Sequence, residues 1–125
     1  MNVKEYLGQI KKLEKMISNK TDEIEKFRKI KGAFLLESEN GHRVAALESE
    51  ALQYVNDLLV KQGEISKTIE KLESHVEYDL LYKMYIQGKT LQEVADIYGR
   101  TYSWSTTIHH MAKKSLQKIL DDGCN

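Results

Sequence analysis

Residues 90–99 have the sequence TLQEVADIYG, which contains signals for both the start and the end of a helix. Thr90 followed three residues later by Glu93 fits a capping box, in which the threonine hydroxyl accepts from the Glu93 amide and the carboxylate accepts from the Thr90 amide. Gly99 favours the left-handed conformation that ends a helix. The stretch therefore predicts a helix of two turns from Leu91 to Tyr98.

Helical segments flank this short helix on both sides. Upstream, residues 78–86 are densely apolar and lead to Gly88, which predicts a compact helix that ends at this glycine. Downstream, a third helix is expected from Tyr102 or Ser103 to Leu120. Its apolar side is formed by Ile108, Ala112, Leu116, Ile119 and Leu120.

The second and third helices together form a helix-turn-helix pattern. Two steeply crossing helices need a small residue at their closest approach, here Ala95, and a glycine that turns the chain within three or four residues. Ile108 stands where the third helix is expected to pack back on the second. Arg100 and Ser105 occupy positions that are usually apolar in this motif, and Tyr102 and Trp104 supply the apolar contacts if the turn is longer than usual.

The first 76 residues follow a different, heptad period. One run of a and d positions has seven apolar members out of nine, and a second run has eight out of ten. The first run consists of Val3, Tyr6, Ile10, Leu13, Ile17, Lys20, Ile24, Phe27 and Lys31. The second consists of Val44, Glu48, Ala51, Val55, Leu58, Gln62, Ile65, Ile69, Leu72 and Val76. We expect an antiparallel coiled-coil hairpin, with a loop at about residues 32–43, that also self-associates.

Composition agrees with an all-α protein. The chain has 125 residues, no proline and seven glycines, whereas sandwiches and barrels need many glycine- and proline-containing turns. The predicted organisation is a heptad hairpin over residues 1–76 and a three-helix helix-turn-helix domain over residues 77–125.

Charge is balanced overall but not along the chain. The 19 basic and 19 acidic residues cancel, yet residues 80–120 contain 6 Lys/Arg against 2 Asp/Glu. The single cysteine, Cys124, allows no internal disulfide and favours a reducing compartment. With no apolar run long enough to span a bilayer and no signal peptide at the N-terminus, we expect a cytoplasmic protein that does not engage membranes.

Residues 78–120 resemble the fourth region of bacterial sigma factors, and resemble still more the small phage transcriptional regulators of the ArpU and RinA type. Shared features are a glycine before a Thr-Leu-x-Glu-Val-Ala segment and a second glycine before the recognition helix. In this chain they are Gly88, Thr90, Leu91, Glu93, Val94, Ala95 and Gly99. The phage group also carries two heptad helices ahead of the reader domain. The resemblance implies a sequence-specific DNA-binding regulator of phage or prophage type.

The outward positions of the predicted recognition helix are the candidate DNA-binding residues. With Ile108 and Ala112 inward, hydroxyls, an imidazole and a threonine methyl are available to base edges, and Arg100 and the lysines are available to phosphates. The set is Arg100, Tyr102, Ser103, Thr106, Thr107, His110, Lys113 and Lys114. We read Trp104 as a core side chain.

The expected partners are double-stranded DNA, a second copy through the heptad helices, and RNA polymerase, which sigma region four contacts. The alternative is a protein-interaction or assembly module that binds RNA polymerase or another protein without reading DNA, which the neutral overall charge favours. The sequence contains no catalytic motif. His109 and His110 are adjacent, so they lack the i, i+4 spacing of a zinc pair. We therefore expect no enzyme activity, no cofactor and no metal.

Overall fold

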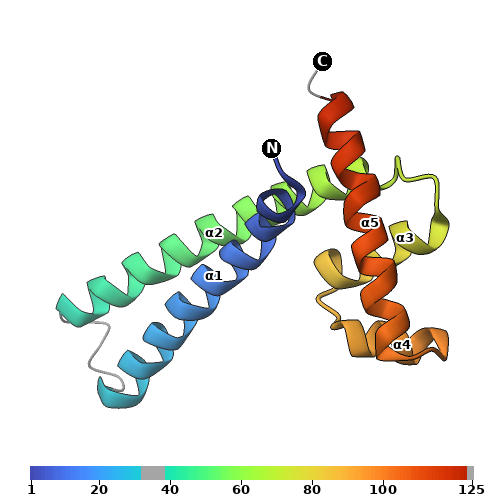
Figure 1. Ribbon diagram of the computed structural model, residues 1–125. Coiled ribbons are helices and arrows are strands. Elements are labelled where there is room, and N and C mark those ends of the chain that lie inside the picture. Colours follow the sequence, from blue (N-terminus) through green and yellow to red (C-terminus); the bar gives the residue numbers. More distant parts are fainter. Residues whose placement is uncertain (32–38, 124–125) are drawn as a thin grey trace. The chain divides into compact units, whose positions relative to one another are not determined.

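The computed structural model describes residues 1–31 and 39–123, and every regular element in these two ranges is helical, as predicted. In chain order the elements are α1 (Val3–Lys31), α2 (Glu39–Ile69), α3 (His75–Leu81), the π-helical turn η2 (Tyr82–Ile86), α4 (Leu91–Tyr98) and α5 (Tyr102–Gly123) (Figure 1). Cys124, from which the reducing compartment was inferred, lies outside the described residues.

The chain divides into two compact units that cut across the two long helices. Unit 1 comprises Met1–Gln9 and Lys61–Asn125, and unit 2 comprises Ile10–Val60. The structural grouping therefore differs from the division after residue 76 that the sequence suggested. The first turns of α1 and the last turns of α2 belong with the three C-terminal helices.

Unit 2 consists of the remaining parts of α1 and α2, which lie side by side (Figure 1). Ile24 of α1 forms a buried cluster with Val44 and Leu47 of α2, and Phe27 packs against it. Ion pairs link the two helices along their edges. They join Lys20 to Glu50 (2.8 Å), Arg43 to Glu23 (3.3 Å) and Arg28 to Glu48.

The bounds predicted from the first heptad run are correct for α1, but both ends predicted for the second helix are wrong. α1 is continuous at Lys20, a charged residue within the first heptad run, and α2 is continuous at Gly63, although glycine disfavours helix interiors. However, α2 already begins at Glu39, inside the expected loop, while residues 32–38 lie outside the described part. It ends at Ile69 instead of Val76 because the last turn tightens, with the Leu72 N–H donating to the Ile69 carbonyl (3.0 Å).

Unit 1 brings together segments that are far apart in sequence. Leu7 of α1 and Ile65 of α2 belong to it and are buried, as are Leu80 and Leu81 of α3 and Leu116 of α5. The side chain of Gln117 accepts from the Val3 N–H (2.8 Å) and donates to the Met1 carbonyl (3.3 Å). The Tyr6 hydroxyl donates to Thr68 Oγ1 (2.8 Å). The N-terminal residues thus contact α5 and help to hold it in place within unit 1.

Candidate nucleic-acid interface

The start of α4 has the capping box that the sequence predicted. The Glu93 N–H donates to Thr90 Oγ1, and the Thr90 N–H donates to Glu93 Oε1, both at 3.1 Å. Two backbone N–H groups that would otherwise lack partners are satisfied by this exchange. The predicted bounds of α4, Leu91 to Tyr98, are confirmed.

The turn between α4 and α5 occupies only residues 99–101. Gly99 has φ 65° and ψ 35°, the left-handed conformation that an L side chain rarely adopts. The Arg100 N–H donates to the Ala95 carbonyl (2.8 Å), which closes the end of α4. Thr101 then caps α5, because its Oγ1 accepts from the Trp104 N–H (3.1 Å). α5 begins at Tyr102, as predicted, and runs three residues beyond the expected end, to Gly123.

The packing of α4 against α5 extends the inward face expected for the third helix to Ser105. Ala95 is fully buried, as predicted, and so are Ser105 and Ala112 of α5. Ile108, expected to face inward together with Ala112, lies on the same side of α5 and is half-buried. The burial of Ser105 places it on the inward face of α5. Its side chain is small enough to fit there. Its hydroxyl has no hydrogen-bond partner in the described parts of the chain.

An aromatic contact joins the start of α5 to the end of α4. The ring of Trp104 lies 5.1 Å from that of Tyr98, and the Arg100 guanidinium lies 5.9 Å from the Trp104 ring centroid. Trp104 thus packs inside unit 1, half-buried. Tyr102 does not supply the second apolar contact that the sequence suggested, because its side chain is exposed.

A polar triad connects α4 to α3 and η2. The Tyr98 hydroxyl donates to Asp79 Oδ2, and the Lys83 ammonium donates to Asp79 Oδ1 (2.8 Å). Partial burial opposes ionisation of Asp79, but the hydrogen bonds from Lys83 and Tyr98 outweigh it and hold the pKa of this carboxyl below its usual range. Partial burial and the hydrogen bond to Asp79 together raise the pKa of Tyr98 to about 12.

The outward side of α5 carries a continuous polar stripe. Ser103, Thr107, His110 and Lys114 are all exposed and follow each other at intervals of four, three and four residues, which places them on one face of the helix. Arg100 and Tyr102 are exposed near its start. Thr106 and Lys113, predicted to face outward, are half-buried, because the register centred on Ser105 moves them to the edge of the stripe.

Two of the candidate hydroxyls already have intrahelical partners. Thr106 Oγ1 donates to the Ser103 carbonyl (2.8 Å), and Thr107 Oγ1 donates to the same oxygen (3.0 Å). These hydroxyls retain lone pairs as acceptors, and their methyl groups remain as apolar contact surfaces. The two threonines are therefore suited to accept from an amino group or to contact a methyl group.

Positive charge flanks this stripe without neutralising partners. Within residues 1–31 and 39–123, no ion pair involves Arg100, Lys113, Lys114 or Lys118. By contrast, Lys83 is paired with Asp79. The four unpaired cations are available to an anionic ligand such as a phosphate.

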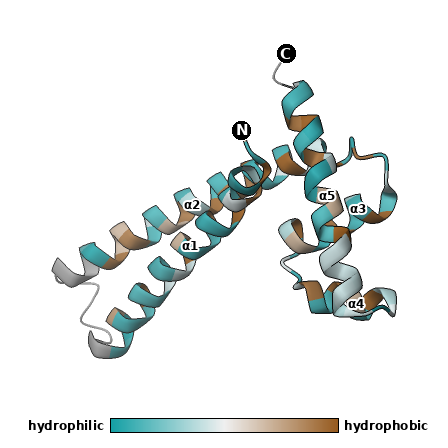
Figure 2. Ribbon diagram, in the orientation of Figure 1, coloured by the Kyte–Doolittle hydropathy of each residue, from teal (hydrophilic) through white to brown (hydrophobic). Residues whose placement is uncertain are grey.

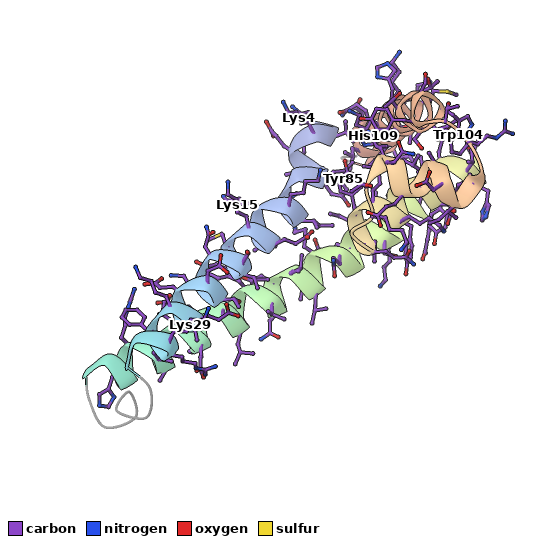
Figure 3. The ribbon with its side chains drawn as sticks, turned by 90° about the horizontal axis from the view of Figure 1, so that it is seen from below. Lys4, Lys15, Lys29, Tyr85, Trp104 and His109 are labelled. Atoms are coloured by element: carbon purple, nitrogen blue, oxygen red, sulfur yellow. The ribbon has the colours of Figure 1, made fainter. Side chains whose placement is uncertain are left out.

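The adjacent histidines have different environments. His110 is exposed on the stripe, whereas His109 points inward, with its Nε2 3.1 Å from the Tyr85 hydroxyl (Figure 3). The two rings stack at 6.1 Å between centroids, and burial raises the pKa of the Tyr85 phenol. Tyr85 lies in η2, and the sequence offered no signal for a π-helical turn there.

Three large side chains of unit 1 are exposed; Tyr102 was expected to face outward, but the sequence analysis missed Ile97 and Met111. Ile97 of α4 is 54% exposed, and Tyr102 and Met111 of α5 are 53% and 46% exposed. A helical projection of α5 from its true buried face, Ser105 and Ala112, would have placed Met111 outside the core.

Comparisons with protein-family models, with curated proteins and with solved structures give no significant match to this chain. Within the described ranges, no helix is both long enough and apolar enough to cross a membrane.

Proposed function

We propose that this chain is a sequence-specific DNA-binding transcriptional regulator of the phage or prophage type. In this proposal α3 to α5 form a helix-turn-helix domain, and α1 and α2 form an antiparallel hairpin that self-associates. The observation that carries the proposal is the exposed stripe Ser103, Thr107, His110 and Lys114 on a helix that follows a capped α4 and a left-handed glycine.

The stripe fits the chemistry of a major groove. A helix enters this groove with one face against the base edges, and hydroxyl, imidazole and methyl groups can contact them there. Thr106 and Thr107 would contribute methyl groups and acceptor lone pairs, because their hydroxyl hydrogens are given to the Ser103 carbonyl. Arg100, Lys113 and Lys114 would neutralise phosphates at the edges of the groove.

The second candidate function is a protein-interaction module that binds RNA polymerase or another protein without reading DNA. The balanced overall charge favours it, because the 19 basic residues are offset by 19 acidic ones. Ile97, Tyr102 and Met111 add exposed apolar side chains, with Tyr102 and Met111 on opposite sides of α5. Both functions use α4 and α5, so an experiment must separate them.

The test is a selection from a random duplex DNA pool, followed by binding titrations of the selected site at low and moderate salt. A reader that neutralises several phosphates is expected to lose about 10³-fold in affinity across that range. If no DNA is enriched and no duplex binds at any salt, the protein-interaction function replaces the proposal.

Single substitutions then separate base contacts from phosphate contacts. Lys114→Ala is expected to weaken binding to all duplexes equally and to lower the salt slope by about one unit. Thr107→Ala or His110→Ala is expected to cost about 1–3 kcal/mol on the selected site and much less on scrambled DNA. Lys15→Ala is the matched control for the lysine, because Lys15 projects from α1 away from α2 (Figure 3).

A further inference from the structure

The two helices of unit 2 have opposite kinds of exposed surface. Between residues 11 and 29, twelve side chains of α1 are exposed, nine of them charged and none apolar. Between residues 45 and 60, ten side chains of α2 are exposed, only two of them charged and five apolar. Figure 2 shows the difference as a mostly hydrophilic α1 beside an α2 with several hydrophobic segments.

The apolar members of the α2 surface are large and well exposed. Leu52, Leu59 and Val60 are 64%, 61% and 62% exposed. On a helical projection they share one side of α2 with the small or uncharged residues Ala45, Ala46, Ser49, Gln53 and Asn56. We call these eight residues the α2 face. The two exposed acids, Glu50 and Asp57, lie at its edge and already have partners, Lys20 and Gln53.

A groove of about 420 Å³ borders the α2 face where α1 meets α2. Its walls are mostly apolar and include Ile17 and Ile24 of α1 and Ala51, Leu52 and Val55 of α2. Leu52 therefore belongs both to the face and to the groove wall. A large aliphatic side chain from a partner helix would find apolar atoms on both sides there.

The chemistry of the face restricts what can cover it. It has no lysine or arginine, so it offers nothing to DNA or to an acidic protein, and its apolar side chains need an equally uncharged helix face. The α2 face is itself such a surface, with leucines at 52 and 59 separated by smaller residues. A second copy presents the complementary surface through two-fold symmetry.

We propose that the α2 face is a homodimer interface in which α2 packs antiparallel on α2 of a second copy. Leu52 of one copy lies beside Leu59 of the other, and the two-fold axis crosses α2 near Val55 and Asn56. The inference rests on the self-association included in the proposed function and names its surface. The a and d positions Val44, Ile65 and Ile69 of the second heptad run are not available to this interface, since they are already buried within the chain.

The size of the face is that of a weak, reversible interface. The 16 residues from Ala45 to Val60 span ~24 Å of helix. Two helices in contact over that length, with the groove filled, bury on the order of 1,000 Å² in total, which is the low end for a specific interface. The dimer is therefore expected to dissociate at micromolar concentrations.

Sedimentation velocity of the full chain at about 1 to 100 μM tests this inference. The wild type is expected to change from monomer to dimer over this range, and Leu52→Lys with Leu59→Lys is expected to remain monomeric. The control adds the same two charges to the water-facing side of α1, as Ser18→Lys with Asn19→Lys, and should dimerise like the wild type. Circular dichroism verifies that each variant is folded.

Asn56→Arg provides a second test, because Asn56 is an exposed polar residue of the face and its replacement removes no apolar contact. It is expected to weaken the dimer at least tenfold. A wild type that stays monomeric at 100 μM overturns the inference together with the self-association. A dimer that all the α2 variants leave intact overturns the α2 face alone, and DNA titrations of the same variants report separately on the reader.

Discussion

Units 1 and 2 differ in how completely each buries its own apolar side chains. Among described side chains, unit 1 has eleven buried apolar residues and unit 2 has four, although unit 2 contains most of both long helices. A narrow apolar stripe between two helices leaves the remaining faces to water or to a partner. Unit 1 therefore has the larger core, whereas unit 2 leaves the α2 face exposed to water or to a partner.

Truncating one leucine in each unit should show the difference in apolar burial between the two units most strongly. Leu116→Ala, in the core of unit 1, is expected to lower the free energy of unfolding by about 2–5 kcal/mol, because it removes apolar contacts and leaves a cavity. Leu52→Ala, at an exposed position of unit 2, should change it by less than about 0.5 kcal/mol at dilute concentration. Urea unfolding of both variants measures the difference, and equal losses would contradict the contrast between the units.

Enlarging one alanine in each unit should destabilise the protein in unit 1 and leave its stability unchanged in unit 2. Ala95→Leu overpacks the fully buried side of α4 and is expected to cost about 1–3 kcal/mol and to abolish the proposed DNA binding at the same time. Ala46→Leu adds the same atoms to the exposed α2 face and should leave the monomer stable. Thermal melting of the two variants, with a DNA titration, is the measurement; an unchanged melting temperature for Ala95→Leu would mean that the site is less crowded than its burial indicates.

Removing one hydroxyl tests whether a buried polar group in the core of unit 1 lowers the free energy of unfolding. Ser105→Ala deletes a fully buried hydroxyl without a partner in the described chain and should stabilise the protein by about 1 kcal/mol. Ser103→Ala, two residues earlier and exposed, should leave the stability unchanged. Guanidinium unfolding compares the two, and destabilisation by Ser105→Ala would show that this hydroxyl has a partner.

The smallest expected effect is a pH dependence within unit 1. Because the folded pKa of Tyr98 is raised to about 12, its contribution to stability is complete below pH ~10 and is lost as the pH rises through about 12. Tyr98→Phe should therefore lower the melting temperature at neutral pH and flatten its decline above pH ~10. Tyr102→Phe, at an exposed position, is the control, and identical alkaline profiles for wild type and Tyr98→Phe would contradict the role of this hydrogen bond.

The sequence alone predicted the features that depend on neighbours within a few residues. The exchange between Thr90 and Glu93, the left-handed Gly99 and the start of α5 at Tyr102 follow from local backbone hydrogen bonding and from the freedom of glycine. The heptad spacing likewise predicted two long helices, because a helical apolar stripe is a property of each segment by itself.

Which of these apolar positions are buried depends on packing between segments that are distant in sequence, so a local pattern cannot predict it. The heptad pattern continues past Ile69, but α2 stops there as the chain tightens before α3. Ser105 is buried on the packed side of α5 because it is small, despite its polar hydroxyl. With Ser105 facing inward, Thr106 and Lys113 lie at the edge of the stripe. The joining of Met1–Gln9 to the C-terminal unit, with Gln117 bonded to Val3, required contacts over more than a hundred residues, which no local pattern encodes.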